Sequence, residues 1–434
     1  MSVRLSIWSE LDEADRFNVL QRPAVAADVK IRDDVIRIVD AVRAGGDTAV
    51  RDLTRTFDGA EIDRLRISPE EIEAAAGELD AEALAAIDLA IANVRRFHEQ
   101  QVPQPIVVET MPGVRCRRVS HPLDAVGLYV PAGTAPLPSA AVMLAVPAAI
   151  AGCPVRVMCT PPRQDGTADP AVIVAASRAG IREIFKIGGA QAIAAMAYGT
   201  ETVPKVCKVF GPGNAWVTSA KTLVSADAGG AAIDMPAGPS EVLVIADDSA
   251  SPAFVASDLL SQAEHGTDSQ VVLVTTSAAL AADVRTELDR QLAVLSRAEI
   301  AAEALRHSLV IVVEDLQTAV DVSNRYAPEH LILQCRRVAE LLPSVRNAGS
   351  VFVGEWTPES VGDYCSGTNH VLPTYGFARN YSGLGVDQFM RQMTIQELTR
   401  EGLQGLGDAV ITLAELEGLD AHAHAVRLRL EAGP

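Results

Sequence analysis

The 434-residue chain lacks a cysteine pattern, a long hydrophobic run and a surplus of basic residues. Its six cysteines are irregularly spaced and form no Cys-x-x-Cys pair, which predicts reduced thiols in a cytosolic protein rather than disulfides. The longest apolar run, residues 140–151, contains Pro147 and is shorter than the roughly 20 residues that span a bilayer. The N-terminus has no apolar stretch typical of a signal peptide. We therefore expect a cytoplasmic protein without a membrane role.

Basic residues are also fewer than acidic ones. The chain has 37 Lys and Arg and 56 Asp and Glu, which gives a net charge of −19. Such a surface repels nucleic-acid phosphates and anionic lipids, so neither is an expected partner. Hydrophobic residues make up 48% of the chain, which is enough for a large buried core. This composition excludes a disordered protein and a small disulfide scaffold.

Short Val- and Ile-rich runs alternate with helical patterns in two successive series, at residues 126–224 and 241–356. Continuous apolar runs are typical of strands that helices cover on both faces. The two series predict an α/β fold with two doubly wound, incomplete Rossmann-like domains, plus small helical segments at the N- and C-termini.

Two groups of polar residues lie near the ends of predicted helices. Gln262 and His265 are three residues apart, which would place both on one helix face. They could hold a divalent metal such as zinc, or form a polar helix end in water. Glu329 and His330 follow Pro328, which marks a helix end, and open an apolar strand. An acid beside an imidazole suits general acid–base chemistry, and a surface turn is the alternative.

Two further groups lie in glycine-containing stretches. Asp363 and His370 could converge on one site or belong to a local turn. Glu417 is separated from His422 and His424 by a glycine that we expect to break a helix. That break could bring Glu417 close to a histidine, but spacing does not choose between the two histidines. An exposed helical hairpin would have the same pattern.

A nucleotide site has weaker support, because no complete G-x-G-x-x-G follows a predicted strand. Gly211-Pro-Gly213-Asn214 and Gly188-Gly189-Ala-Gln191 each lie between a strand and a helix. Backbone N–H groups at such helix starts could accept a phosphate. Each turn is common by itself, and their occurrence in one β/α series favours a nucleotide site.

Eight segments resemble the histidinol dehydrogenase family, in the same order and over nearly the whole chain. They are GLYVPAGTAPLPS (127–139), KIGGAQAIAAMAYGT (186–200), KVFGPGNAWVTSAK (208–221), MPAGPSEVLVIADD (235–248), SQAEHGTDSQ (261–270), NRYAPEHL (324–331), GDYCSGTNHVLPTYG (362–376) and EGLDAHAHAV (417–426). The resemblance implies an enzyme of the last step of histidine biosynthesis. It would oxidise L-histidinol to L-histidine through L-histidinaldehyde, a four-electron reaction that uses two NAD⁺.

The resemblance also implies the residues of the site. Acid–base catalysis would fall to Glu329 and His330. One Zn²⁺ per subunit would be held by Gln262, His265, Asp363 and His422. The substrate would contact Ser240, Gln262, His265, His330, Asp363, His370, Glu417 and His422. NAD would contact Tyr129, Gln191 and Asn214. The zinc would position the substrate, and the family implies a homodimer whose sites are completed across the interface.

The expected domain boundaries combine this resemblance with the two β/α series. They are an N-terminal helical segment at 1–25, an α/β domain carrying most of the metal and catalytic site at 26–128 and 238–378, an NAD-binding α/β domain at 129–237, and a C-terminal helical domain at 379–434. A zinc-dependent hydrolase in which Glu329 activates water is the alternative function, although it would need no NAD site. A non-catalytic β/α ligand-binding protein is the second alternative, and it would leave Glu329 and His330 without a role.

Overall fold

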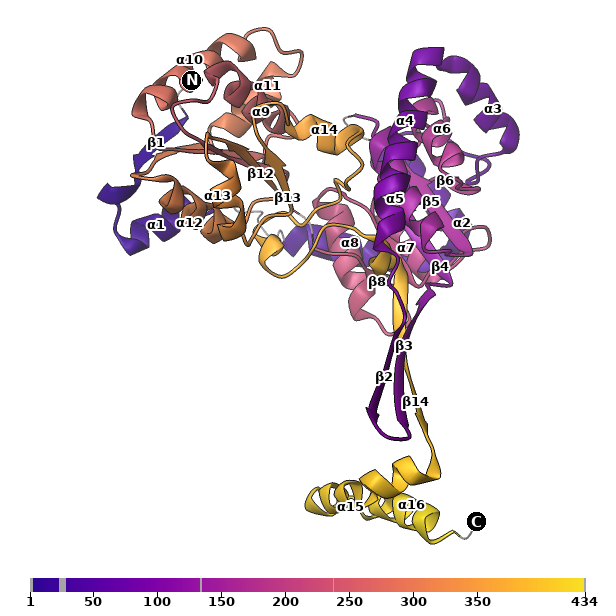
Figure 1. The fold of residues 1–434 in the computed structure, drawn as a ribbon. Helices are drawn as coiled ribbons and strands as arrows, with labels where there is room; N and C mark the ends of the chain where they lie inside the picture. The colour runs from indigo at the N-terminus through magenta and orange to yellow at the C-terminus, as the bar shows by residue number, and fades with distance from the viewer. Residues whose placement is uncertain (1–2, 23–28, 133–134, 237, 433–434) are drawn as a thin grey trace.

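The computed structural model describes residues 3–22, 29–132, 135–236 and 238–432. Two α/β bodies lie side by side, and a narrow three-stranded arm carries two helices and the C-terminus away from both (Figure 1). The predicted α/β class with two parallel sheets is confirmed. Within the described residues, no helix combines the length and the apolar character needed to cross a membrane. All six cysteines are unpaired.

The first body is built on a six-stranded parallel sheet in the order β1-β11-β10-β9-β12-β13. Its strands are β1 (Arg4–Ile7), β9 (Glu241–Ala246), β10 (Gln270–Thr275), β11 (Leu309–Val312), β12 (His330–Gln334) and β13 (Ser350–Val353). Its helices are α1 (Glu13–Val19), α9 (Pro252–Ala263), α10 (Ala278–Leu292), α11 (Ala298–Leu305), α12 (Leu316–Tyr326), α13 (Val338–Leu341) and α14 (Glu359–Tyr364). Every residue of β9, β10 and β12 is buried, as expected for strands covered on both faces.

The second body holds a five-stranded parallel sheet in the order β6-β5-β4-β7-β8. Its strands are β4 (Ala125–Tyr129), β5 (Val155–Thr160), β6 (Glu183–Lys186), β7 (Lys208–Phe210) and β8 (Ala232–Ile233). Its helices are α2 (Val29–Asp58), α3 (Pro69–Glu78), α4 (Ala81–His98), α5 (Pro138–Ile150), α6 (Pro170–Arg178), α7 (Gly189–Tyr198) and α8 (Ala215–Ala226). The strand order reverses between β4 and β7, which is where ligands bind in open α/β sheets.

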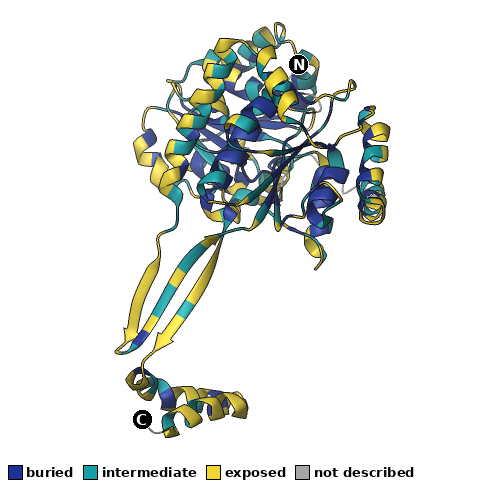
Figure 2. Ribbon diagram, turned by 90° about the vertical axis from the view of Figure 1, so that its right-hand side faces the viewer, coloured by how far each residue is buried: buried dark blue, intermediate teal, exposed yellow. Residues whose placement is uncertain are grey.

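The arm is an antiparallel sheet in the order β14-β3-β2, followed by two packed helices. It comprises β2 (Ile106–Met111), β3 (Val114–Pro122), β14 (Met390–Leu398), α15 (Arg400–Leu416) and α16 (Asp420–Glu431). The arm and its helices are largely exposed (Figure 2), and every residue of β2 is exposed. Apolar side chains of the arm are exposed to water in the single chain. Such exposure indicates a surface that another molecule covers.

Three predicted domain boundaries are wrong. Residues 26–128 do not join the six-stranded body, because α2, α3 and α4 pack on α7, α6 and α5 of the other body. Residues 1–25 are not only helical, since β1 pairs with β11. Residues 379–434 include β14, which pairs with β3. A helical sequence pattern does not indicate which sheet the apolar face of the helix will cover. The domain to which each segment belongs could therefore be assigned only from the three-dimensional packing.

Candidate active site

The candidate acid–base pair lies at the amino ends of two neighbouring central strands. Glu241 begins β9, His330 begins β12, and the two strands pair in parallel. Ala327 takes a left-handed conformation (φ 54°) before Pro328, which ends α12 and turns the chain into β12. After this irregular entry, Nδ1 of His330 and Oε2 of Glu329 lie 3.7 Å apart.

Glu241 connects the two members of the pair through its backbone. Its N–H donates to Oε2 of Glu329 at 3.0 Å, and its carbonyl oxygen lies 3.3 Å from Nδ1 of His330. With the proton on Nδ1, that contact is a hydrogen bond, and the lone pair stays on Nε2. Nε2 is buried and has no hydrogen-bond partner in the described part of the chain. The imidazole therefore offers an accepting nitrogen to a substrate.

Burial changes the pKa of both groups in opposite directions. It lowers the pKa of His330 to about 3, so the imidazole is neutral at pH 7. Burial also raises the pKa of Glu329 well above its ordinary value, and the nearby carboxylates of Glu241 and Asp363 add to the effect. A carboxylate with a raised pKa is a stronger base than one in water. The pair thus combines a neutral imidazole with a basic carboxylate.

A cluster suited to metal binding lies beside this pair. His265, Glu359 and Asp363 each offer one ligand atom, and these atoms lie within 4.8 Å of one another. Asp363 approaches His265 at 4.0 Å and Nε2 of His330 at 3.8 Å. Burial raises the pKa of Asp363 to about 6. Asp363 lies on the short helix α14.

Gln262 gives an independent indication of a ligand-binding site. Both polar atoms of its amide are buried and have no hydrogen-bond partner among the described residues. Such atoms destabilise a fold unless another group binds them. An amide oxygen, an imidazole and a carboxylate form a donor set that fits zinc. Gln262 lies in the last turn of α9, whereas His265 follows the helix end, so the two do not share a helix face as predicted.

Of the four remaining predicted residues, His370 joins this cluster, Ser240 lies next to Glu241 in the chain, and Glu417 and His422 lie elsewhere. Nδ1 of His370 lies 3.0 Å from the carbonyl oxygen of Asp363, and burial lowers the pKa of His370 to about 4. Ser240 is half-buried and directly precedes Glu241. Glu417 and His422 are exposed on the two terminal helices, far from the pair within one chain (Figure 1). Gly418 breaks the helix as predicted, and Leu419 is the N-cap of α16.

The predicted cofactor residues gather at the carboxyl edge of the five-stranded sheet. Tyr129 ends β4, and its hydroxyl accepts a hydrogen bond from the N–H of Gly189 at 3.0 Å. Gln191, in the first turn of α7, donates to Asp58 at 3.4 Å. Asn214 caps α8 through its Oδ1 atom. All three lie at the carboxyl edge of this sheet, and Tyr129 and Asn214 adjoin β4 and β7, between which the strand order reverses; this position is consistent with a nucleotide site.

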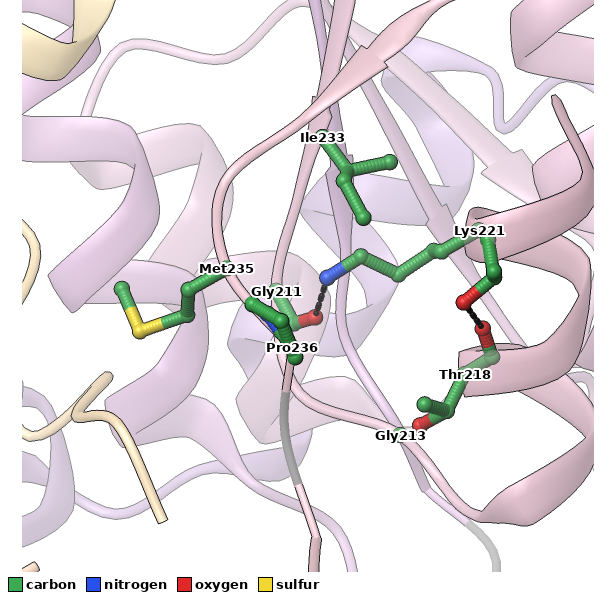
Figure 3. Close-up of a pocket in the computed structure, with 8 residues that line it drawn as sticks. Gly211, Gly213, Thr218, Lys221, Ile233, Met235 and Pro236 are labelled. Atoms are coloured by element: carbon green, nitrogen blue, oxygen red, sulfur yellow. Dashed lines mark hydrogen bonds between the residues drawn. The ribbon is translucent and has the colours of Figure 1, made fainter. Parts of the chain in front are cut away.

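The turn between β7 and α8 is held rigidly in place. Figure 3 shows Lys221 reaching from α8 to Gly211, whose carbonyl oxygen accepts from Nζ at 2.8 Å. Asp234 pairs with Nζ and accepts from the N–H of Gly211. A Cβ atom on Gly211 (φ 119°) would lie 2.1 Å from the carbonyl oxygen of Tyr129, so only glycine fits. The adjacent hollow of about 10 Å³ is too small for a cofactor.

Sequence reasoning missed three acidic residues of these sites. Glu241 is the first residue of an otherwise apolar strand and was not singled out. A charged residue at the start of a buried strand indicates that an ion-pair or hydrogen-bond partner lies nearby. Glu359 lies four residues before Asp363, a spacing that places both on one helix face. Asp58, the partner of Gln191, has its pKa raised to about 6 by burial. It ends a long helix and no local signal indicated its role.

Asp258→Asn is expected to stabilise the protein in a pH-dependent manner. Burial raises the pKa of Asp258 to about 7, and Gln334 donates to it at 2.6 Å. The folded state therefore binds this proton more tightly than the unfolded state, and stability is lost as pH rises from about 4 to about 7. The asparagine variant should gain about 2 kcal/mol or more in unfolding free energy at pH 8, and clearly less at pH 5.

Urea unfolding of both proteins between pH 5 and pH 8 measures this gain. Asp283→Asn, which changes an exposed residue of α10, is the control and should leave the difference near zero throughout. A gain for Asp258→Asn that is equal at pH 5 and pH 8 would contradict the assignment.

Comparisons with known proteins match nearly the whole chain. The profile of the histidinol dehydrogenase family matches residues 20–430. Histidinol dehydrogenase of Vibrio cholerae serotype O1 is 55% identical over 429 residues, covering 99% of both chains. That of Xanthomonas axonopodis pv. citri is 54% identical over 423 residues, covering 98% of both. The crystal structure of histidinol dehydrogenase from Elizabethkingia anophelis superposes with a TM-score of 0.96 at 44% identity, covering 99% of this chain and 98% of that one.

Proposed function

The chain belongs to the histidinol dehydrogenase family, and from this premise we propose how its residues oxidise L-histidinol. The family activity is that of an NAD-dependent oxidoreductase that performs the last step of histidine biosynthesis. The alcohol first becomes an aldehyde, which adds water and is then oxidised to the carboxylate of L-histidine. The observation that carries the residue assignment is the buried, unpartnered Nε2 of His330, which faces the cluster around Asp363.

His330 accepts a proton in both oxidations. Its Nδ1–H is directed to the carbonyl oxygen of Glu241, which holds the ring with Nε2 toward the substrate. Nε2 takes the hydroxyl proton of the alcohol as the hydride leaves carbon, and later that of the hydrated aldehyde. The low pKa of His330 keeps the ring neutral, so the accepting nitrogen is available at pH 7.

Glu329 activates the water that adds to the aldehyde. One carboxylate oxygen is held by the N–H of Glu241, and the other can take a proton from water. Burial makes this carboxylate a stronger base than an exposed glutamate. The addition of water to the aldehyde takes place between the two oxidations and needs a base. Glu329 is adjacent to His330, which accepts the proton in both oxidations.

Zinc would be held by Gln262, His265 and Asp363, with His422 as the fourth ligand. The orphaned amide of Gln262 and the short distances within the cluster support this assignment. When bound, zinc would supply a Lewis acid that positions the substrate, because Zn²⁺ has no redox chemistry of its own. The remaining substrate contacts would come from Ser240, His330, His370 and Glu417.

The cofactor would contact Tyr129, Gln191 and Asn214, and NAD⁺ supplies the hydride acceptor when bound. Tyr129 ends β4 and Asn214 follows β7, the two strands between which the order reverses, and the Tyr129 hydroxyl contacts Gly189 just before Gln191, which supports this assignment. Oδ1 of Asn214 already caps α8, so its amide nitrogen is the atom left for a ligand. The cytoplasmic location stays a prediction.

The functional unit would be a homodimer in which α15 and α16 of one subunit cover the site of the other. Exposed apolar residues support this arrangement on both sides of the contact. Trp356 is 80% exposed and Tyr364 is 57% exposed next to Asp363, while Leu413 and Leu416 are 60% and 79% exposed on α15. A partner's arm would cover these surfaces and bring Glu417 and His422 to the cluster.

The ratio of NADH formed to L-histidinol consumed tests this function directly. We expect two NADH per histidinol, and loss of turnover after prolonged chelation that added Zn²⁺ restores. A zinc hydrolase would form no NADH, and a binding protein would consume no histidinol. A ratio of one would show that the reaction stops at the aldehyde and would contradict the second oxidation.

A further inference from the structure

Four arginines line a cavity of about 610 Å³ next to Glu241. They come from three segments that are distant in the sequence: Arg16 and Arg22 near α1, Arg325 at the end of α12, and Arg379 in the loop before β14. Among the described residues that line the cavity, only Glu13 is acidic. The volume is typical of sites for small molecules. We call this cavity the arginine pocket.

The positive charge of the arginine pocket is only partly neutralised. Arg22 is paired with Glu241, while Arg16 and Arg325 share Glu13 at 3.3 and 3.1 Å. Four guanidinium groups thus face two carboxylates, in a chain whose net charge is −19. A local surplus of two positive charges is unusual on such a background and attracts anions.

Two of the guanidinium groups converge on one point. A Cβ atom built on Gly376 would lie 2.9 Å from Nη1 of Arg379 and 3.1 Å from Nη1 of Arg22. The backbone therefore holds two like charges close together around a glycine (φ 77°). Burial and the charge of Arg22 lower the pKa of Arg379, which reflects the same repulsion. An anion between the two groups would relieve it.

We propose that the arginine pocket binds the phosphoryl group of a small organic phosphate. Arginine forks match the geometry of phosphate oxygens, and a phosphate dianion balances the surplus of two positive charges. Phe17 and Tyr375 supply aromatic walls for the organic part of the ligand. The arginine pocket is distinct from the residues proposed to bind zinc and NAD.

Occupancy of the arginine pocket would reach the catalytic pair through one residue. Arg22 binds both carboxylate oxygens of Glu241, at 2.5 and 2.8 Å, and the backbone of Glu241 contacts Glu329 and His330. A phosphate that shares Arg22 would change how firmly Glu241 is held. This consequence rests on the proposed function, whereas binding itself does not, so the test measures binding.

Calorimetric titration of inorganic phosphate and pyrophosphate into the full-length, zinc-loaded protein at low ionic strength tests the proposal. We expect saturable binding of one pyrophosphate per subunit, weakened about tenfold or more in the double variant Arg325→Met/Arg379→Met. The control is Arg306→Met/Arg336→Met, which removes two arginines of the same body that are 59% and 62% exposed outside the pocket. Its affinity should match that of the unmodified protein.

Repeating the titration with saturating NAD⁺ distinguishes two sources of the phosphoryl group. Binding lost in the presence of NAD⁺ would assign the pocket to the diphosphate of the dinucleotide, and binding that persists would assign it to a separate phosphate compound. If the double variant fails to fold, Arg379→Met alone should still weaken binding. No saturable heat, or equal affinity in the folded variant and the control, would overturn the proposal.

Discussion

Glu329→Gln is expected to slow the conversion of histidinaldehyde to histidine by about 10²–10⁴-fold, the range of a lost general base. The oxidation of histidinol to the aldehyde should fall far less, because His330 accepts the proton in that step. Glutamine keeps the size of the side chain and can still accept a hydrogen bond from the N–H of Glu241. The substitution therefore removes the base and leaves the local structure in place.

Separate assays with histidinol and with histidinaldehyde as substrate measure the two effects. Glu359→Gln is the matched control, because Glu359 is a buried carboxylate 3.9 Å from His330 that we do not assign to water activation. If removing any buried negative charge beside His330 caused the loss, both variants would behave alike. Equal losses of alcohol and aldehyde oxidation in Glu329→Gln would contradict its role in water addition.

The interiors of both sheets were predictable because their strands carry an unmistakable local signal. The segment EVLVIA of β9 is apolar for five successive residues, and such a run is stable only between two covering layers. The arm was not predictable in the same way. All residues of β2 are exposed and most residues of β3 are only partly buried, so no burial pattern marks these strands, and β14 reaches them from nearly 300 positions away.

The proposed acid–base pair was predictable as a local feature, and its surroundings were not. Pro328 marks the helix end, so Glu329 and His330 could be assigned to a strand entry from sequence alone. The contact with Glu241 depends on β9 and β12 being neighbours, which strand order in the sequence does not reveal. The site also lies at the amino ends of these strands, whereas the general rule for open sheets favours the carboxyl ends.

His422→Ala is expected to abolish tight zinc binding and activity, whereas His424→Ala should retain both. The family resemblance implies His422 rather than His424, and both histidines are exposed on α16 in a single chain. Metal analysis after dialysis against a weak chelator measures the difference, and the two variants serve as each other's control for damage to the helix. Loss of zinc in His424→Ala alone would reverse the assignment.

Mixing two inactive variants tests whether His422 acts in the partner's site. Asp363→Ala damages the body of the site and His422→Ala damages the arm, so each homodimer should be inactive. A mixed dimer contains one site with an intact body and an intact arm, and one site with both defects. Since half of randomly formed dimers are mixed, co-expression should restore about a quarter of the unmodified activity. If each site used residues of only one chain, every site would carry one defect and co-expression would restore no activity.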